Sequence, residues 1–230
     1  MSLFRRKSQP AEPEEATEPE PVDEQVELGP GPWDVVDVPD LDGRLDLGSL
    51  RVPRREGMQV KLEIEKKTQQ VVAVSLAKDG SSVQLQVFAA PRSAGIWDEL
   101  REEIAASVRQ RGGTCDDVPG TFGPELVARV PATSGDGQAV HRPARFVGVD
   151  GPRWFLRAVF TGRAALDQQA AELLEGVLQE VVVVRGQEAH APRDVLALQV
   201  PGRPAAPAAT GAEDEGLHLL RRGPEITETR

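Results

Sequence analysis

The chain has 230 residues, of which 39% are hydrophobic, and its formal net charge at pH 7 is −10. A single cysteine, Cys115, excludes an intramolecular disulfide framework, and no run approaches the roughly 18 apolar residues that a membrane-spanning helix needs. We therefore expect one soluble cytoplasmic domain with tails, and no insertion into a membrane.

The two ends of the chain differ in composition from its middle. Residues 1–27 carry eight acidic and three basic side chains, and the C-terminal end is rich in Pro, Ala, Gly and Glu. Such segments bury too little apolar surface to offset their ordering entropy. The composition predicts disordered tails over residues 1–30 and 205–230, and a single α+β domain over residues 31–204. The basic head Phe4-Arg5-Arg6-Lys7 is interpreted as an exposed terminus or as a short docking handle.

The first ordered stretch runs from Trp33 to Leu47 and mixes apolar residues with five aspartates. Calcium loops need a defined ligand spacing with a Gly turn and a closing Glu, which this stretch lacks. It is interpreted as an irregular segment packed by Trp33 rather than as a metal site.

Three strands are predicted next. Residues 58–65 alternate between apolar and polar side chains, as a half-buried strand does, and residues 71–77 form a β-branched run. The segment Lys78-Asp79-Gly80-Ser81 predicts a tight hairpin turn, because Asp-Gly tolerates positive φ. Residues 83–88 alternate again, so an antiparallel meander with one solvated face is expected.

A helix is predicted over residues 94–111, with Ser93 as its N-cap, Gly112-Gly113 as its C-terminal stop and one apolar stripe. The stripe is interpreted as the side that packs on the sheet. Residues 114–124 are expected to form a loop.

The second half of the chain repeats this mixture of strands and a helix. Strands are predicted at residues 125–131, 145–149, 153–161 and 181–185, with a further one at 195–200. The strands at 145–149 and 153–161 are apolar on both faces, which is typical of central strands. A helix is predicted over residues 164–180, with an apolar stripe made of Leu166, Ala170, Leu173, Leu174 and Val177. These elements predict an α+β fold, with a mainly antiparallel sheet of about seven strands and two long helices packed against one face.

Residue patterns that support catalysis or cofactor binding are missing from the sequence. There is no Gly-x4-Gly-Lys-Ser/Thr phosphate loop and no Gly-x-Ser-x-Gly nucleophile elbow. Cys115 is flanked by Asp116 and Asp117, whose charges raise the pKa of a thiol. One cysteine and three scattered histidines (His141, His190 and His218) do not supply a zinc site. We predict no catalytic residue, no metal and no cofactor.

Arginines around the predicted hairpin at Asp150 form the most prominent group of charges. The interleaving of cations with an aromatic side chain is typical of sheets that bind nucleic acid. The candidate residues for binding an anion or a nucleic acid are Arg145, Arg153, Phe155, Arg157 and Arg163. The alternative is that nearby acidic residues pair with these arginines in structural ion pairs.

Several long phrases of the sequence are found together in one known family. They are GPWD at 31–34, DGRLDLGSL at 42–50, AAPRSAGIW at 89–97, FVGVDGPRWFLR at 146–157 and VVVVRG at 181–186. The chain resembles the actinobacterial family catalogued as domain of unknown function 3710, over about residues 30–204. The resemblance implies a cytoplasmic actinobacterial protein and carries over no catalytic or binding residue.

Three hypotheses of function follow. The first is a non-enzymatic interaction or accessory module whose partner is another protein. The second is an accessory protein that binds nucleic acid or anions through the arginine-rich face. The third is a small-molecule enzyme whose site the sequence does not reveal.

Overall fold

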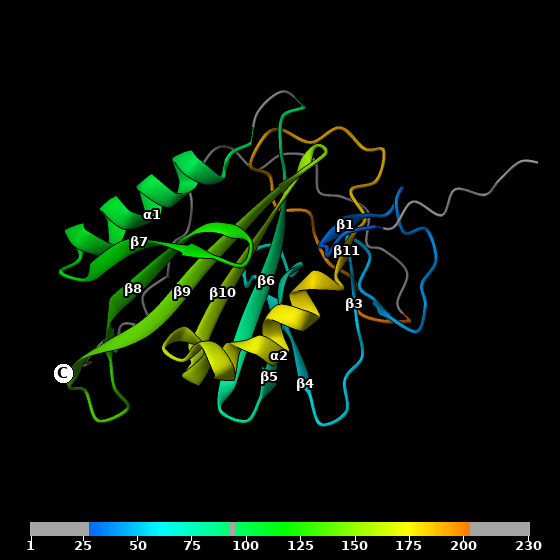
Figure 1. Cartoon of the computed structure of the whole chain (residues 1–230). Helices are drawn as coiled ribbons and strands as arrows, with labels where there is room; N and C mark the ends of the chain where they lie inside the picture. The colour runs from blue at the N-terminus through cyan, green and yellow to red at the C-terminus, as the bar shows by residue number, and fades with distance from the viewer. Residues whose placement is uncertain (1–27, 93–94, 203–230) are drawn as a thin grey trace, which may run out of the picture.

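Seven strands form one antiparallel sheet in the computed structural model, which describes residues 28–92 and 95–202 (Figure 1). Their order is β4-β5-β6-β10-β9-β8-β7, so β10 takes the middle position. The strands are β4 (Gln59–Ile64), β5 (Val71–Lys78), β6 (Ser81–Ala89), β7 (Thr114–Gly120), β8 (Gly123–Thr133), β9 (Ala139–Gly151) and β10 (Trp154–Gly162). The expectation of a mainly antiparallel sheet of about seven strands is confirmed.

A smaller sheet has the strand order β1-β11-β3-β2. Its strands are β1 (Trp33–Asp34), β2 (Leu45–Asp46), β3 (Leu50–Val52) and β11 (Val182–Val183). The segment predicted to be irregular, residues 33–47, thus supplies two short strands, and the strand predicted at 181–185 is β11. Leu50 and Val183 are buried in the same cluster as the residues of β5 and β6, so the small sheet packs onto the large one.

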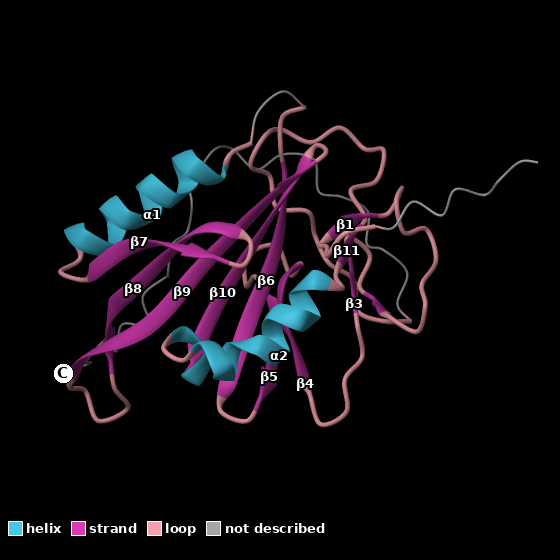
Figure 2. Cartoon of the chain, viewed as in Figure 1, coloured by secondary structure: helices cyan, strands magenta, loops and turns pink. Residues whose placement is uncertain are grey.

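The two helices cover opposite faces of the large sheet, which corrects the expectation that both lie on one face. Successive side chains of a strand point to opposite faces. On β10, Leu156 and Phe160 are buried with residues of α2 (Gln168–Gln179), whereas Phe155 is buried with residues of α1 (Trp97–Gln110). We call these sides the α2 face and the α1 face. Figure 2 shows α1 beside β7 and β8, and α2 in front of β5 and β6.

Asp150 holds the N-terminus of α1, a role that the sequence assigned to Ser93. Its Oδ1 accepts a hydrogen bond from the N–H of Ile96 at 2.8 Å, and its Oδ2 accepts one from the N–H of Trp97 at 3.3 Å. Ser93 itself lies outside the described residues. A carboxylate at this position satisfies N–H groups that have no partner within the helix. The hairpin between β9 and β10 therefore fixes where α1 begins.

The second predicted helix divides into two elements. A 3-10 helix covers Arg163–Ala165, and α2 begins after Asp167, whose side chain accepts a hydrogen bond from the N–H of Gln169 at 3.0 Å. This break shifts the apolar stripe, so the predicted stripe is partly wrong. Leu166 is 67% exposed and Leu173 is 42% exposed. The buried side chains of α2 are Ala171, Leu174, Glu175, Val177 and Leu178.

The tight turn at Asp79-Gly80 is confirmed, with φ of +51° and +75° for its two residues. The loop predicted at residues 114–124 is wrong, because β7 occupies most of it and pairs with β8. Asp117 and Pro119 disfavour a strand by composition. An edge strand tolerates both, since one of its sides needs no partner.

The C-terminal strap, residues 195–199, ties the two sheets together by isolated backbone bonds rather than as the strand predicted there. The N–H of Leu196 donates to the carbonyl of Val87 at 2.9 Å, and that of Leu198 to Val71 at 2.7 Å. The next N–H along the strap donates to the carbonyl of Leu47, also at 2.7 Å. The strap thus joins β5 and β6 to the connection between β2 and β3 of the small sheet.

The tails predicted at residues 1–30 and 205–230 lie outside the described residues, apart from 28–30, and so does the head at Phe4. Within the described ranges, no helix is long and apolar enough to cross a membrane.

The contact between Trp97 and Gly148 of β9 gives a test of the fold. A Cβ at Gly148 would overlap the indole ring, so Gly148→Ala is expected to lower the free energy of unfolding by roughly 1–3 kcal/mol. The matched control is Gly176→Ala in α2, where nothing lies near a Cβ; it should raise stability by about 0.5–1 kcal/mol. Urea unfolding followed by tryptophan fluorescence measures both, and an unchanged Gly148→Ala variant would contradict the contact.

Candidate functional site

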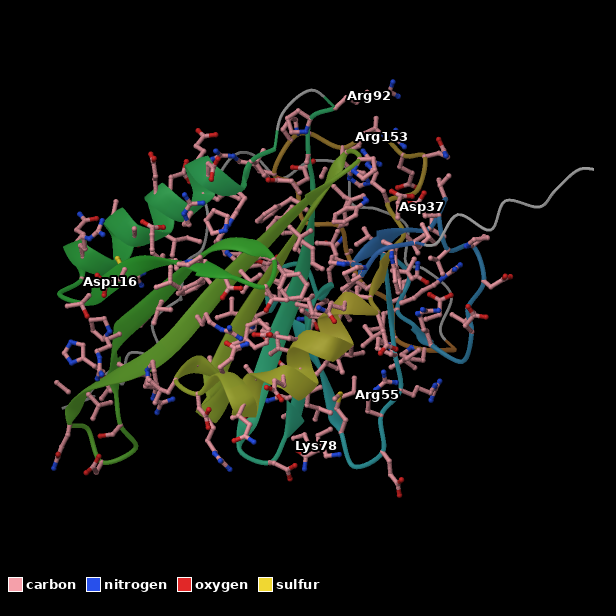
Figure 3. All side chains as sticks on the ribbon, viewed as in Figure 1. Asp37, Arg55, Lys78, Arg92, Asp116 and Arg153 are labelled. Carbon is pink, nitrogen blue, oxygen red and sulfur yellow. The ribbon has the colours of Figure 1, made fainter. Side chains whose placement is uncertain are left out.

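The five residues of the predicted arginine cluster do not share one surface. Arg145 of β9 is paired in register with a core residue of the α2 face. Phe155 and Arg157 of β10 lie on the opposite, α1 face. Arg153 lies in the turn between β9 and β10 with φ of +64°, and Figure 3 shows it at the tip of that hairpin. Arg163 begins the 3-10 helix. The sheet therefore separates Arg145 from Arg157.

Arg145 is part of a buried polar cluster. Its Nη2 lies 2.6 Å from Glu175 Oε1 of α2, and its Nη1 lies 3.2 Å from Glu125 Oε2 of β8. The guanidinium also lies 4.4 Å from the ring centroid of Phe160. Gln168 donates from Nε2 to both carboxylate oxygens of Glu175, at 3.1 and 3.0 Å. For Arg145, the structure thus shows the structural ion pair that was the alternative to anion binding.

Two carboxylates share this one guanidinium, and Glu125 is the more deeply buried, with 1% of its surface exposed. Desolvation raises the pKa of Glu125, the positive charge of Arg145 opposes that shift, and the negative charge of Glu175 adds to it. Oε1 of Glu125 has no hydrogen-bond partner within the described part of the chain. The net effect is a raised pKa of Glu125, because desolvation outweighs the charge of Arg145 and the backbone hydrogen bonds from Phe122 and Thr121.

Phe155 and Arg157 are held by the α1 face. The ring of Phe155 is fully buried between Trp97, at a centroid distance of 5.9 Å, and Phe88, at 6.0 Å. Arg157 lies over the Phe88 ring at 5.3 Å and donates to Oε1 of Gln86. Burial lowers the pKa of Arg157 to about 10. Phe155 has no exposed face on which a base could stack.

Cys115 lies in β7 and is buried. Its Sγ donates to the carbonyl of Ala105 at 3.6 Å. Burial is the main cause that raises the pKa of the thiol, and the charges of Asp116 and Asp117 raise it further, while Arg109 opposes them. The neighbouring aspartates predicted a raised thiol pKa, and this direction is confirmed. Burial, the largest cause of the shift, was not apparent from the sequence.

The residues considered for metal binding are dispersed or engaged elsewhere. Asp34, the first of the five aspartates, accepts a hydrogen bond from Nε1 of Trp154 at 2.8 Å. His141 lies 3.3 Å from a backbone carbonyl of the α1–β7 connection, and His190 lies 3.9 Å from Glu188. Within residues 28–92 and 95–202, no three His, Cys, Asp or Glu side chains are grouped to hold a metal ion.

An open cleft of about 200 Å³ lies between α2 and the β5–β6 hairpin. Arg163 lines it, together with Lys78, Asp167 and Leu173. Lys78 donates from Nζ to the carbonyl of Glu56 at 2.9 Å, and Asp167 caps α2. Two of the charged side chains in this cleft thus serve the fold.

The free edge of β4 is a feature that the sequence did not reveal. No described strand pairs with the outer side of β4. Its α2-face side chains are Val60, Leu62 and Ile64. Leu62 packs against the core, whereas Val60 is 47% exposed and Ile64 is 55% exposed. Two large apolar side chains therefore lie along an unpaired edge.

The α1-face side of β4 is polar. Glu63 accepts hydrogen bonds from Oγ of Ser75 at 2.5 Å and from Nε2 of Gln84 at 2.6 Å, so its carboxylate is fixed over β5 and β6. Gln59 and Lys61 are exposed on the same side. Lys61 has no carboxylate partner among the described residues.

The opposite edge of the sheet, β7, is built differently. It carries Asp116 and Asp117, both exposed, and contains Pro119. Asp117 accepts a hydrogen bond from Nε of Arg101 in α1 at 2.6 Å. Figure 3 shows Asp116 at the side of the molecule away from Lys78, which lies at the β4–β5 end of the sheet. Carboxylates and a proline discourage pairing at that edge.

The alternation at residues 58–65 correctly predicted a strand, but the expected burial of one of its faces is wrong, because Val60 and Ile64 are exposed and Leu62 is only partly buried. It did not place that strand at the edge, because the order of strands depends on pairing between distant segments. Arg145 and its two carboxylate partners were missed for the same reason, since Glu125 and Glu175 are far apart in sequence. The only local signal was a glutamate at a helix position that packs toward the sheet.

The raised pKa of Glu125 predicts a pH dependence of stability. An unfolded glutamate has a pKa of about 4.3, so the folded protein binds this proton more tightly. The free energy of unfolding should therefore lose a contribution as pH rises through and above that value. Glu125→Gln, which does not titrate, should remove this loss. Denaturant unfolding between about pH 4 and 8 measures it, with Glu172→Gln, at an exposed glutamate of α2, as the control. A Glu125→Gln profile parallel to the wild type would contradict the assignment.

Comparison with known proteins adds one finding. A search of curated proteins found no match. The family model described as Protein of unknown function (DUF3710) matches residues 31–207, which is most of the chain and nearly all of its described part. The match agrees with the resemblance carried by the phrases around Trp33, Trp97 and Asp150. The chain therefore belongs to the DUF3710 family of proteins of unknown function.

Proposed function

We propose that the protein is a non-enzymatic interaction module that binds another protein chain along β4. The observation that carries this proposal is the unpaired edge of β4 with exposed Val60 and Ile64. An edge strand offers a row of backbone N–H and C=O groups to a second strand. Added strands gain affinity from main-chain hydrogen bonds and specificity from alternate side chains.

The placement of the polar groups supports binding rather than catalysis. The buried cluster around Arg145 and Glu125 lies inside the α2 face, where it joins α2 to β8 and β9. The cleft beside Arg163 has its lysine and its helix-capping aspartate bound within the fold. The proposal includes a cytoplasmic location, which the free thiol of Cys115 and the family resemblance support.

Charged substitutions on the edge test the proposal. Val60→Lys combined with Ile64→Lys places two charges where the apolar side chains are exposed, so the fold should persist while partner binding is lost. Leu166→Lys, at an exposed apolar residue far from β4 in sequence, is the matched control. The measurement is affinity capture with the tagged full chain, followed by hydrogen exchange of β4 in the captured complex. The proposal would be overturned if Leu166→Lys reduced capture as much as the β4 variant does. It would also be overturned if hydrogen exchange showed no added protection of β4 in the captured complex.

Anion or nucleic-acid binding is a second candidate, because three of the predicted arginines lack a counter-charge. Within the described residues, Arg153, Arg157 and Arg163 have no carboxylate partner. The guanidinium of Arg157 is held against Phe88 and Gln86, so Arg153 and Arg163 are the two side chains that we propose for contact with a phosphate backbone.

A salt series tests this candidate. Binding of a single-stranded oligonucleotide, followed by fluorescence anisotropy, should weaken steeply with salt. Each of Arg153→Ala and Arg163→Ala should lower the slope of log K against log salt by about 0.7 if it removes one phosphate contact. Arg129→Ala, at an exposed arginine of β8, should leave the slope unchanged. A flat salt response in the wild type would exclude the candidate.

A further inference from the structure

We infer that β4 binds a second copy of this chain, with the two β4 strands antiparallel about a two-fold axis at Leu62. The inference rests on the proposed function, since it names the partner of the same edge. It would join the two large sheets into one continuous sheet across the dimer.

The alternation of β4 restricts how two copies can pair. Directly opposed residues of an antiparallel pair point to the same face of the sheet. A two-fold axis perpendicular to the sheet keeps the α2 face of one copy continuous with the α2 face of the other. Apolar residues then oppose apolar residues only if the axis passes through a residue rather than between two.

The charges of β4 select one residue as the centre. An axis at Lys61 would place two lysines opposite each other, and an axis at Glu63 would oppose two glutamates. Like charges directly opposed destabilise a sheet. An axis at Leu62 instead places Lys61 opposite the partner's Glu63, twice by symmetry.

The same centre also matches the exposed apolar side chains and the length of the strand. With Leu62 opposite its own copy, Val60 opposes the partner's Ile64 on both sides of the axis. These are the two apolar side chains of β4 that the described fold leaves about half exposed. Leu62 is also near the middle of β4, Gln59–Ile64, so this register uses most of the strand.

The state of the two charged residues within one chain fits this pairing. The carboxylate of Glu63 is bonded inward to Ser75 and Gln84, so the flexible Lys61 side chain of the second copy would have to reach across the edge to it. Lys61 is exposed and has no carboxylate partner in the described part of the chain. The contact would therefore supply Lys61 with an acidic neighbour without breaking an ion pair.

The assembly would stop at two copies. A two-fold contact uses the same edge of both chains and leaves none of that edge free. The remaining edge of the large sheet is β7, with Asp116, Asp117 and Pro119. A row of carboxylates and a proline do not template a further strand.

Cysteine pairs test the register directly. Residues 60 and 64 of opposite chains would have Cβ atoms about 4.5–5.5 Å apart, close to the separation that a disulfide bridges. A mixture of full-length Val60→Cys and Ile64→Cys should form a cross-linked dimer under mild oxidation, while each variant alone should not. The wild type, whose only cysteine is buried Cys115, is the control. Cross-linking of Val60→Cys alone, or none in the mixture, would overturn the register.

A charge exchange tests the same contact without oxidation. Sedimentation equilibrium should show a wild-type dimer, and Lys61→Glu should raise its dissociation constant roughly tenfold, because two carboxylate pairs would be opposed. The double variant Lys61→Glu, Glu63→Lys should recover the affinity. Thermal unfolding of each monomer checks for loss of the bonds to Ser75 and Gln84, and an equimolar mixture of Lys61→Glu with Glu63→Lys repeats the rescue.

The outcomes separate this inference from the proposed function. A monomer at all concentrations, with capture of another protein that Val60→Lys and Ile64→Lys abolish, would overturn the dimer and keep β4 as the docking edge. A dimer indifferent to all β4 variants would place the contact elsewhere and overturn the inference. A monomer whose β4 variants change no binding would overturn both.

Discussion

Strand β10 is apolar on both of its faces, and the arrangement of the other elements follows from covering both. The side chain of Phe155 is buried on one face, and those of Leu156 and Phe160 are buried on the other. Because a sheet that is apolar on both faces is stable only between two layers, α1 and α2 lie on opposite sides. Cover decreases with distance from β10, so the strands with exposed or charged side chains stand at the two ends of the sheet.

The local parts of this fold could be read from the sequence, and the long-range parts could not. The Asp79-Gly80 turn and the strand β4 depend on neighbouring residues, and both were predicted, whereas the expected burial of one face of β4 was wrong. The face on which each helix packs depends on contacts across the sheet. The start of α1 is set by Asp150, which lies more than fifty residues later in the chain. The break before α2 depends on a single capping aspartate. The predicted stripe ignored that break and therefore wrongly assigned Leu166 to the core.

The candidate site shows the same limit more strongly. Arg145, Arg153 and Arg157 are close in sequence and were therefore grouped. In the structure, Arg145 and Arg157 lie on opposite faces of the sheet, and Arg153 lies in the turn between β9 and β10. Arg145 is paired because Glu175 reaches it from α2. Removing the helix would leave the guanidinium with Glu125, at 3.2 Å, as its one carboxylate partner in the described chain and would break its shorter contact. The ion pair therefore ties α2 to one position on the sheet.

The C-terminal strap has a consequence for how the chain is made. Its N–H groups bond to the carbonyls of Leu47, Val71 and Val87. These three residues are synthesised well before the strap, so their carbonyls have no such partner until the strap is made. At a synthesis rate of about 5–20 residues per second, Leu198 follows Leu47 by roughly 8–30 s. During that interval the small sheet and the start of β5 lack their last backbone partners. A nascent chain thus passes through a period in which its N-terminal half has emerged but is not yet closed, and in which premature termination before the strap leaves those carbonyls open to other chains.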